Sequence, residues 1–301
     1  MQVLLEKINI IFNFNKPELK YFLIPVFLFN IIVFSNSFGQ YRKKADWDST
    51  KQYHSNLDVK IFRSFNNINS NFVYHMTDIT NKAITPVMIV APIGLYIGSK
   101  IDNNAYGENA AVLLALSELT SAGVTQGIKY LVKRPRPFRT LNSVYLSDTS
   151  AVDGTYSFPS GHSSVSFSLA TSLTLSYPDE PVLIAGLYTY ATITSLGRIY
   201  SGVHYPSDVF TGMVIGAGSA ALIYSLRKPI IEATNNLFNQ SDRNDNISPG
   251  NINAPAFLLA IAATDFINYY FTNSKNKIFK NSELNISTSP TSNSLHYSFK
   301  F

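Results

Sequence analysis

Two histidines and one aspartate supply the side chains that acid–base and nucleophilic chemistry needs. Histidine titrates near neutral pH, so it can attack as a nucleophile when neutral and donate a proton when charged. Asp208 lies four residues after His204, and Pro206 between them suits the first position of a helix. We therefore expect the Asp208 carboxylate to bond one imidazole nitrogen of His204, which leaves the other nitrogen as the nucleophile. His162 is the second acid–base candidate.

Cations in the same three segments indicate that the ligand is an anion. They are Lys129, Arg136 and Arg198, and an arginine guanidinium can hold a phosphate through two parallel hydrogen bonds. Ser160 and Gly161 directly precede an apolar stretch. Backbone N–H groups at a helix start, together with the helix dipole, favour an anion. The segments together predict an anion-binding pocket.

Taken singly, each segment has a plainer interpretation. A histidine at a helix start is usually a cap or a solvated residue, and the sequence 159–162 alone is an ordinary turn. A zinc site built from His162, His204 and Asp208 would lie in a strongly cationic pocket, which disfavours a metal cation. We therefore predict that the site holds no metal and uses no cofactor. We interpret Lys133, Arg134 and Arg139 as surface charge near anionic lipid.

The elements that must position these residues are long apolar stretches. A helix that crosses a bilayer needs about 17–25 residues. Five stretches of about 15–20 residues approach this length, with Glu118 as their single charge: 83–99, 109–128, 163–177, 181–197 and 209–226. We predict an all-α fold, a bundle of about five or six transmembrane helices. The alternative is a buried helical bundle in a soluble protein.

Counting membrane crossings brings the three segments to one side. If residue 41 lies outside, Lys100, Arg227 and Lys228 fall inside, as the positive-inside rule requires. The segments 129–137, 159–162 and 197–208 then share the outer rim. The basic run 133–139 breaks the rule there, which calls for a functional explanation.

The composition supports a membrane location and excludes several chemistries. Charged residues make up 14% of the chain, against about 25% in a typical soluble domain. Cysteine is absent, which excludes disulfides, cysteine nucleophiles, zinc–thiolate sites and iron–sulfur clusters. The net charge of +5 suits anionic lipid or a phosphorylated substrate. Nucleic acid is disfavoured, because the basic residues are spread thinly and form no basic helix.

The three segments resemble the type 2 phosphatidic acid phosphatase (PAP2) superfamily. Its pattern is K-x6-R-P, then P-S-G-H, then S-R-x5-H-x3-D, and the spacings from Lys129 to Pro137, from Pro159 to His162 and from Arg198 to Asp208 match it. Gly197 stands where the family usually has a serine that donates a hydrogen bond to phosphate. Ser195 or Ser201 could compensate for that missing donor. The resemblance implies a helical core of the PAP2 and haloperoxidase type.

The resemblance also implies a metal-independent mechanism of phosphoryl transfer. His204 would attack phosphorus to form a phosphohistidine, and Asp208 would orient it. His162 would protonate the leaving oxygen and later activate water. The phosphate and its transition-state charge would be held by Lys129, Arg136, Ser160, Gly161 and Arg198.

On this basis we divide the chain into four parts. Residues 1–39 are a signal peptide or an N-terminal membrane anchor, because lysines precede the apolar run 21–34 and small residues follow it. Residues 40–82 form an amphipathic extracytoplasmic segment, and residues 83–228 form the PAP2 phosphatase core. Residues 229–301 are an Asn- and Ser-rich tail with one apolar stretch at 254–271 and a strand-like alternation at 295–301.

We expect a phosphatase that removes phosphate from a lipid phosphate or diphosphate. Candidate substrates are undecaprenyl diphosphate, phosphatidic acid, phosphatidylglycerol phosphate and lipid A. The expected location is the bacterial inner membrane, with membrane lipids as neighbours, the active site facing the periplasm and no nucleic-acid partner; the oligomeric state stays open. The alternatives are a soluble periplasmic acid phosphatase, a vanadate-dependent haloperoxidase and a catalytically silent membrane scaffold.

Overall fold

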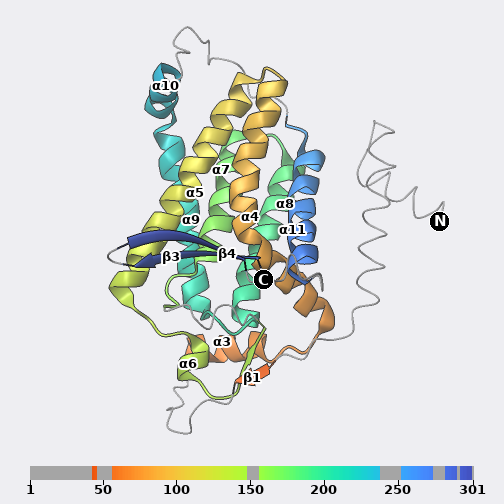
Figure 1. The fold of residues 1–301 in the computed structure, drawn as a ribbon, viewed down its shortest axis with the longest axis vertical. Helices are drawn as coiled ribbons and strands as arrows, with labels where there is room; N and C mark the ends of the chain where they lie inside the picture. The colour runs from red at the N-terminus through yellow and green to blue at the C-terminus, as the bar shows by residue number, and fades with distance from the viewer. Residues whose placement is uncertain are drawn as a thin grey trace, which may run out of the picture. The chain divides into compact units, whose positions relative to one another are not determined.

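The structure is a computed structural model that describes residues 43–45, 56–147, 156–237, 252–273, 282–289 and 292–299. The signal peptide or anchor predicted at 1–39 lies outside these residues. The described part is mainly helical (Figure 1), which confirms the predicted all-α class. Its strands form two short antiparallel pairs, β1 (Lys43–Ala45) with β2 (Val144–Leu146) and β3 (Ser282–Ser289) with β4 (Ser292–Phe299).

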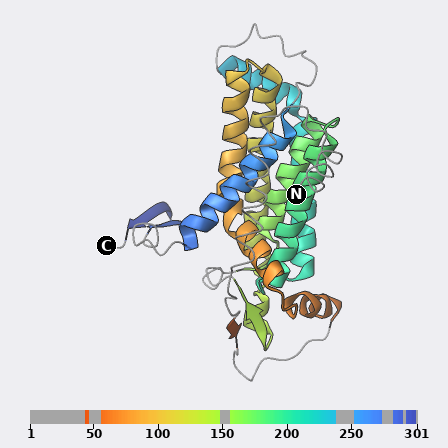
Figure 2. The same cartoon turned by 90° about the vertical axis from the view of Figure 1, so that its right-hand side faces the viewer.

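Five long helices form the bundle. They are α4 (Asn71–Ile101), α5 (Ala105–Val132), α7 (Gly161–Ser176), α8 (Pro181–Tyr200) and α9 (Pro206–Ser225). Helix α7 packs against α4, α5, α8 and α9 and is therefore the central helix of the bundle. Helix α11 (Ala254–Asn273) packs across α4 and α8 (Figure 2).

Local sequence signals set where these helices begin and end. Ser70, Asn104 and Ser160 are N-caps whose side chains accept a backbone N–H of the first turn. Helices α8 and α9 instead begin with a proline, whose missing N–H costs nothing at the first position. Helix α5 stops at Lys133, which adopts a left-handed conformation with φ 52°. The chain after α5 therefore turns back instead of continuing along the helix axis.

Small residues allow α7 and α9 to pack at close range. A Cβ added at Gly216 would lie 2.0 Å from the Ser164 carbonyl oxygen, and one at Gly212 would lie 2.5 Å from the Ser160 carbonyl oxygen. The facing surface of α7 is rich in serine, and Ser160, Ser164 and Ser168 are fully buried. Contacts of this kind are typical of helices that associate within membranes.

Four of the helices are long and apolar enough to cross a membrane. The corresponding spans are Ile84–Ile101, Ala105–Thr140, Pro181–Tyr200 and Pro206–Ser225, and Ala254–Tyr269 is a shorter apolar helix. The fifth predicted crossing, 163–177, corresponds to α7, which has 16 residues and falls short of that length. Large apolar side chains such as Ile93, Leu119 and Phe210 point outward from the bundle. An outward apolar surface is what lipid contact requires.

Shorter elements cover the two ends of the bundle (Figure 1). Helices α3 (Leu57–Asn66) and α6 (Pro137–Thr140) lie with β1 at one end, and α10 (Arg227–Leu237) lies at the other. Buried apolar side chains join α3 and α6 to the bundle: Val59 and Phe62 of α3 and Phe138 of α6 pack with Val203 and Val209. Within the segment 40–82 that was predicted to be amphipathic, α3 is therefore a helix that covers the end of the bundle.

Two predicted boundaries fall inside continuous helices. The break placed between residues 82 and 83 lies within α4, and the break between 228 and 229 lies within α10. The polar start of α4 had indicated a separate surface segment. Its polar side chains, including Thr77 and Asn81, are instead buried against α8, so polarity there does not mark exposure. The strand predicted at 295–301 corresponds to β4 (Ser292–Phe299).

Candidate active site

The three segments singled out by the sequence meet at one end of the bundle. Helices α5 and α8 end there, and α7 and α9 begin there. The Ser160 N–H donates to the Asp208 carbonyl oxygen at 2.9 Å, which ties the start of α7 to the first turn of α9. Arg136 Nη1 donates to the Val203 carbonyl oxygen at 3.1 Å, which ties the loop after α5 to the loop after α8. Two helix N-termini therefore direct their partial positive charge toward this end.

His204 lies between a cation and a carboxylate. Its Nε2 is 3.4 Å from Arg136 Nη1, and its Nδ1 is 3.6 Å from Asp208 Oδ2. The distance of 3.6 Å is too long for a hydrogen bond. His204 and Asp208 are therefore neighbours in this structure but do not form the predicted hydrogen bond. The two ring nitrogens still have different neighbours, because Nδ1 faces the Asp208 carboxylate and Nε2 faces Arg136.

The Asp208 carboxylate is fully buried and is held by donors other than His204. Oδ2 accepts the Tyr205 backbone N–H at 2.8 Å, and Oδ1 accepts Arg134 Nη1 at 2.7 Å. The bond from Tyr205 is the capping bond of α9, so one carboxylate both starts the helix and faces His204. The position of Asp208 is thus fixed before any ligand binds.

Arg134 has a structural role that the sequence interpretation missed. Its guanidinium bonds Asp208, Ser207 Oγ and Asp58 Oδ2, each at 2.7 Å, and lies 3.9 Å from the centre of the Tyr205 ring. The prediction that Arg134 is plain surface charge is therefore wrong. The left-handed turn at Lys133 directs this arginine back toward α9, and the spacing of the motif gives no sign of that turn.

Asp58 is the second member of this network and comes from α3. It accepts the Ser207 N–H at 2.9 Å and the Ser207 hydroxyl at 2.6 Å, in addition to Arg134. Burial alone would raise the pKa of Asp58, but the hydrogen bonds from Ser207 and Arg134 outweigh it and lower the pKa below 3.8. The helix that covers the bundle end is thus tied to α9 by charge as well as by apolar packing.

His204 is held in its neutral form. Its side chain is 3% exposed, and burial lowers its pKa well below 6.5, with further lowering from Arg136, Lys129, Arg198 and His162. Each of these groups disfavours a second positive charge on the ring. A neutral imidazole keeps a lone pair for attack at neutral pH.

The remaining predicted residues lie around this centre. Arg198 is buried, and Lys129 Nζ donates to the Tyr156 carbonyl oxygen at 3.1 Å. His162 Nε2 is 3.0 Å from the Asn81 carbonyl oxygen on α4, a partner that the sequence interpretation did not include. The Ser160 N–H bonds Asp208, and its hydroxyl oxygen accepts from the Ser163 hydroxyl at 2.9 Å. The Ser160 N–H is therefore already engaged, while Gly161 follows it as the first residue of α7.

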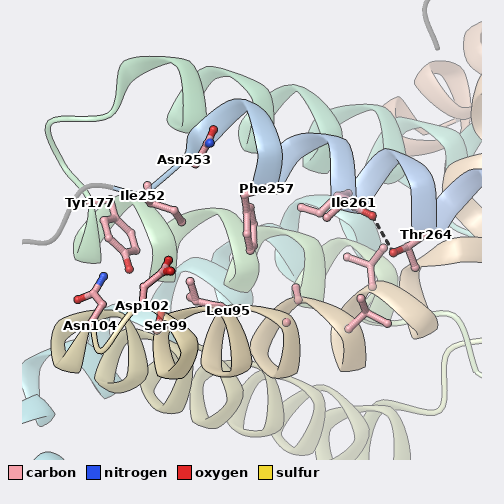
Figure 3. A pocket seen from close by; sticks show the side chains of 16 residues that line it. Leu95, Ser99, Asp102, Asn104, Tyr177, Ile252, Asn253, Phe257, Ile261 and Thr264 are labelled. Atoms are coloured by element: carbon pink, nitrogen blue, oxygen red, sulfur yellow. Dashed lines mark hydrogen bonds between the residues drawn. The ribbon is translucent and has the colours of Figure 1, made fainter. Parts of the chain in front are cut away.

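A pocket elsewhere in the bundle contains none of these residues (Figure 3). It has a volume of about 280 Å³ and lies between α4 and α11, lined by residues such as Leu95, Ser99, Tyr177, Phe257 and Ile261. Tyr177 follows the last residue of α7, whereas Ser160 precedes its first residue. The length of α7, about 24 Å, therefore separates this pocket from the histidines. Among the described residues, no group of three or more His, Asp or Glu side chains could hold a metal ion.

The fold and the site geometry define a membrane-embedded helical bundle with a cationic, histidine-containing centre at one end. Comparison with known proteins identifies the family to which the chain belongs. The family model of the PAP2 superfamily matches residues 110–231. The lipid A 4′-phosphatase of Bacteroides thetaiotaomicron is 31% identical over 182 residues, which cover 58% of this chain and 78% of that protein. This chain belongs to the PAP2 superfamily.

Two further proteins are similar over part of the chain. The undecaprenyl-diphosphatase of Sulfolobus acidocaldarius is 33% identical over 106 residues, which are 35% of this chain and 50% of that protein. The matched segment therefore spans half the length of that relative. The crystal structure of Aquifex aeolicus LpxE aligns with a TM-score of 0.48 and 26% identity, covering 57% of this chain and 96% of that one.

Proposed function

We propose that this protein is a metal-independent phosphatase that acts on a lipid phosphate or diphosphate. The observation that carries the proposal is the setting of His204. A neutral, buried imidazole presents Nε2 to Arg136, and the centre also contains Lys129 and Arg198. Asp208, the carboxylate next to His204, is already paired with Arg134. Several cations therefore gather around the neutral imidazole, an arrangement that suits a phosphate anion.

In the proposed mechanism, His204 Nε2 attacks phosphorus and forms a phosphohistidine. Asp208, next to Nδ1, stabilises the positive charge that develops on the ring during the attack. His162 donates a proton to the leaving oxygen, and in the second step it takes a proton from the water that hydrolyses the intermediate. Lys129, Arg136 and Arg198 stabilise the negative charge of the phosphoryl oxygens.

The membrane setting supports a lipid substrate. The site lies where α9 begins, and Arg227 follows directly after α9 ends. Lys100 lies in the last turn of α4 at that other end. We propose that the end with Lys100 and Arg227 faces the cytoplasm, as the positive-inside rule favours, and that the basic run 133–139 at the opposite end serves the site, which then faces the periplasm. A site at a bundle end lies at the depth of lipid headgroups, where a lipid phosphate can enter from the side.

The relatives narrow the class of substrate. Their names describe enzymes that act on a prenyl diphosphate and on lipid A. We propose the same broad class for this chain, with phosphatidic acid and phosphatidylglycerol phosphate as further candidates. A soluble acid phosphatase is disfavoured, because α4, α5, α8 and α9 have membrane-spanning length and outward apolar side chains.

The test is phosphate release by the purified protein in detergent, with EDTA present. The substrates are undecaprenyl diphosphate, phosphatidic acid, lipid A and a water-soluble aryl phosphate, and His204→Ala is assayed beside the wild type. The proposal predicts turnover of a lipid substrate that persists in EDTA and disappears in His204→Ala. Turnover of the aryl phosphate alone would favour the soluble acid phosphatase. Activity that needs a metal, or that survives in the variant, would refute the mechanism.

A further inference from the structure

Asn81 on α4 lies at the centre described above without an assigned role. Its backbone carbonyl oxygen is 3.0 Å from His162 Nε2, and its Nδ2 donates to Ser201 Oγ at 3.0 Å. The residue is 8% exposed, and its Oδ1 is buried without a hydrogen-bond partner in the described part of the chain. Leaving a buried polar atom unpaired is costly, so an unpaired atom beside a histidine of the site calls for an explanation.

The amide of Asn81 can present its nitrogen at the unpaired position instead. A half-turn about its last side-chain torsion exchanges oxygen and nitrogen with almost no change in shape. The Ser201 hydroxyl can then donate to Oδ1, because a hydroxyl is both donor and acceptor. The unpaired atom becomes an N–H donor. A phosphoryl oxygen, which only accepts hydrogen bonds, satisfies such a donor and cannot satisfy the carbonyl form.

Gly197 creates the space in which this amide lies. A Cβ built on Gly197 would be 3.4 Å from Asn81 Oδ1 and 3.1 Å from Thr77 Cβ. Gly197 directly precedes Arg198, one of the proposed phosphate-binding cations. The missing side chain thus lets α4 approach α8 and place the Asn81 amide beside the backbone that carries Arg198. A side chain at position 197 would crowd Thr77 and contact the Asn81 amide.

We propose that Asn81 is a further phosphate-binding residue of this site, donating a hydrogen bond from its side-chain amide to a phosphoryl oxygen bound at the centre that contains His162. The proposal rests on the phosphatase function given above. It assigns α4 to the site, in addition to the four helices that carry the motif residues.

The first test compares wild type with Asn81→Asp and Asn81→Ala, using inorganic phosphate and orthovanadate as competitive inhibitors of phosphate release. Asn81→Ala removes the donor, whereas Asn81→Asp keeps the shape of the side chain but replaces the donor with a carboxylate that also repels an anion. A hydrogen bond to a charged group contributes about 1.5–3 kcal/mol, so Asn81→Ala should bind these anions about 10- to 100-fold more weakly and Asn81→Asp at least as weakly. The thermal midpoint of unfolding, measured for each variant, shows whether it is folded under the assay conditions.

The second test moves the donor to the other helix. In Asn81→Ala combined with Gly197→Ser, the serine hydroxyl enters the space that the amide vacates, while Thr77 shifts by a few tenths of an ångström. Asn81→Ala combined with Gly197→Ala fills the same space without a donor and is the matched control. The proposal predicts that the serine double variant regains at least part of the lost anion affinity and that the alanine double variant does not.

The outcomes separate this inference from the function on which it rests. If the wild-type protein releases phosphate but folded Asn81→Asp and Asn81→Ala bind both anions as tightly as wild type, Asn81 is not a phosphate-binding residue. Equal anion affinity in the two double variants would also overturn the inference, because the effect would then come from packing alone. If the wild-type protein neither releases phosphate nor binds these anions, the proposed function itself fails.

Discussion

Replacing Arg134 by methionine removes the counter-charge of a fully buried carboxylate. Arg134 donates to Asp208 at 2.7 Å, and the Asp208 side chain is 0% exposed while that of Arg134 is 27% exposed. Methionine has a similar length and fills much of the same volume, so the change mainly removes charge and donors. In Arg134→Met, Asp208 keeps the bond from the Tyr205 N–H but loses the cation that pairs with it.

The expected cost of this change is large. Removing one partner of a buried ion pair typically destabilises a protein by about 3–5 kcal/mol. The bond from Arg134 to Asp58 adds less, because both side chains are partly exposed and water screens their attraction. We therefore expect Arg134→Met to lower the free energy of unfolding by about 3 kcal/mol or more. Asp58→Asn, which leaves the Asp208 pair intact, should cost about 1–2 kcal/mol.

The assay is a double-variant cycle on purified protein in detergent, with stability read from thermal or denaturant unfolding. Combining Arg134→Met with Asp208→Asn removes the uncompensated charge, so the second change should cost less in this background than in the wild type. A coupling of at least about 1 kcal/mol is expected for groups in direct contact. Additive effects, or an Arg134→Met variant within about 0.5 kcal/mol of wild type, would refute the claim that Arg134 neutralises Asp208.

Three further predictions address helix packing and pH. Gly216→Ala should strongly destabilise the protein, because the new Cβ would lie 2.0 Å from the Ser164 carbonyl oxygen. Gly218→Ala on the same helix should be tolerated, because its Cβ meets nothing within 4 Å. Thermal unfolding of the two variants checks this. Because the folded-state pKa of His204 is below 6.5, its stabilising contribution is complete above pH 6.5 and is lost as the pH falls toward the folded pKa. Unfolding measured across this range should therefore show a steeper decline in wild type than in His204→Gln, and equal slopes would contradict the assignment. The lowered pKa of Asp58 places its stabilising contribution above pH 3.8, with loss below that value, so Asp58→Asn should show a flatter decline in stability under acid conditions than wild type.

The sequence was sufficient to predict the meeting of the motif segments. Arg136 lies 68 residues before His204 and 72 residues before Asp208 in the sequence. Alternate crossings by apolar helices nevertheless place all three at one end of a bundle. That argument needs only the length and order of the apolar stretches. It does not give side-chain geometry. The Asp208 carboxylate therefore lies adjacent to His204 but bonds Tyr205 and Arg134 instead.

The contacts that the sequence did not predict are single side-chain hydrogen bonds between segments far apart in the chain. Asp58 reaches Ser207 across 149 residues, and Asn81 reaches His162 across 81 residues. Neither spacing has a periodic or motif signature. The polar start of α4 also gave a misleading signal, because polar residues such as Thr77 and Asn81 are buried where α4 meets Gly197 of α8. An uncharged polar side chain that packs between helices looks the same in sequence as one that faces water.

The central claim is that His204 forms a covalent bond to phosphorus during turnover. The direct measurement is rapid-quench trapping with a radiolabelled lipid phosphate in EDTA, followed by digestion and mapping of the labelled peptide. The account predicts an acid-labile, alkali-stable label on the peptide that contains His204, present in wild type and absent in His204→Ala. Phosphate release without any labelled protein intermediate, or a label on another residue, would contradict it.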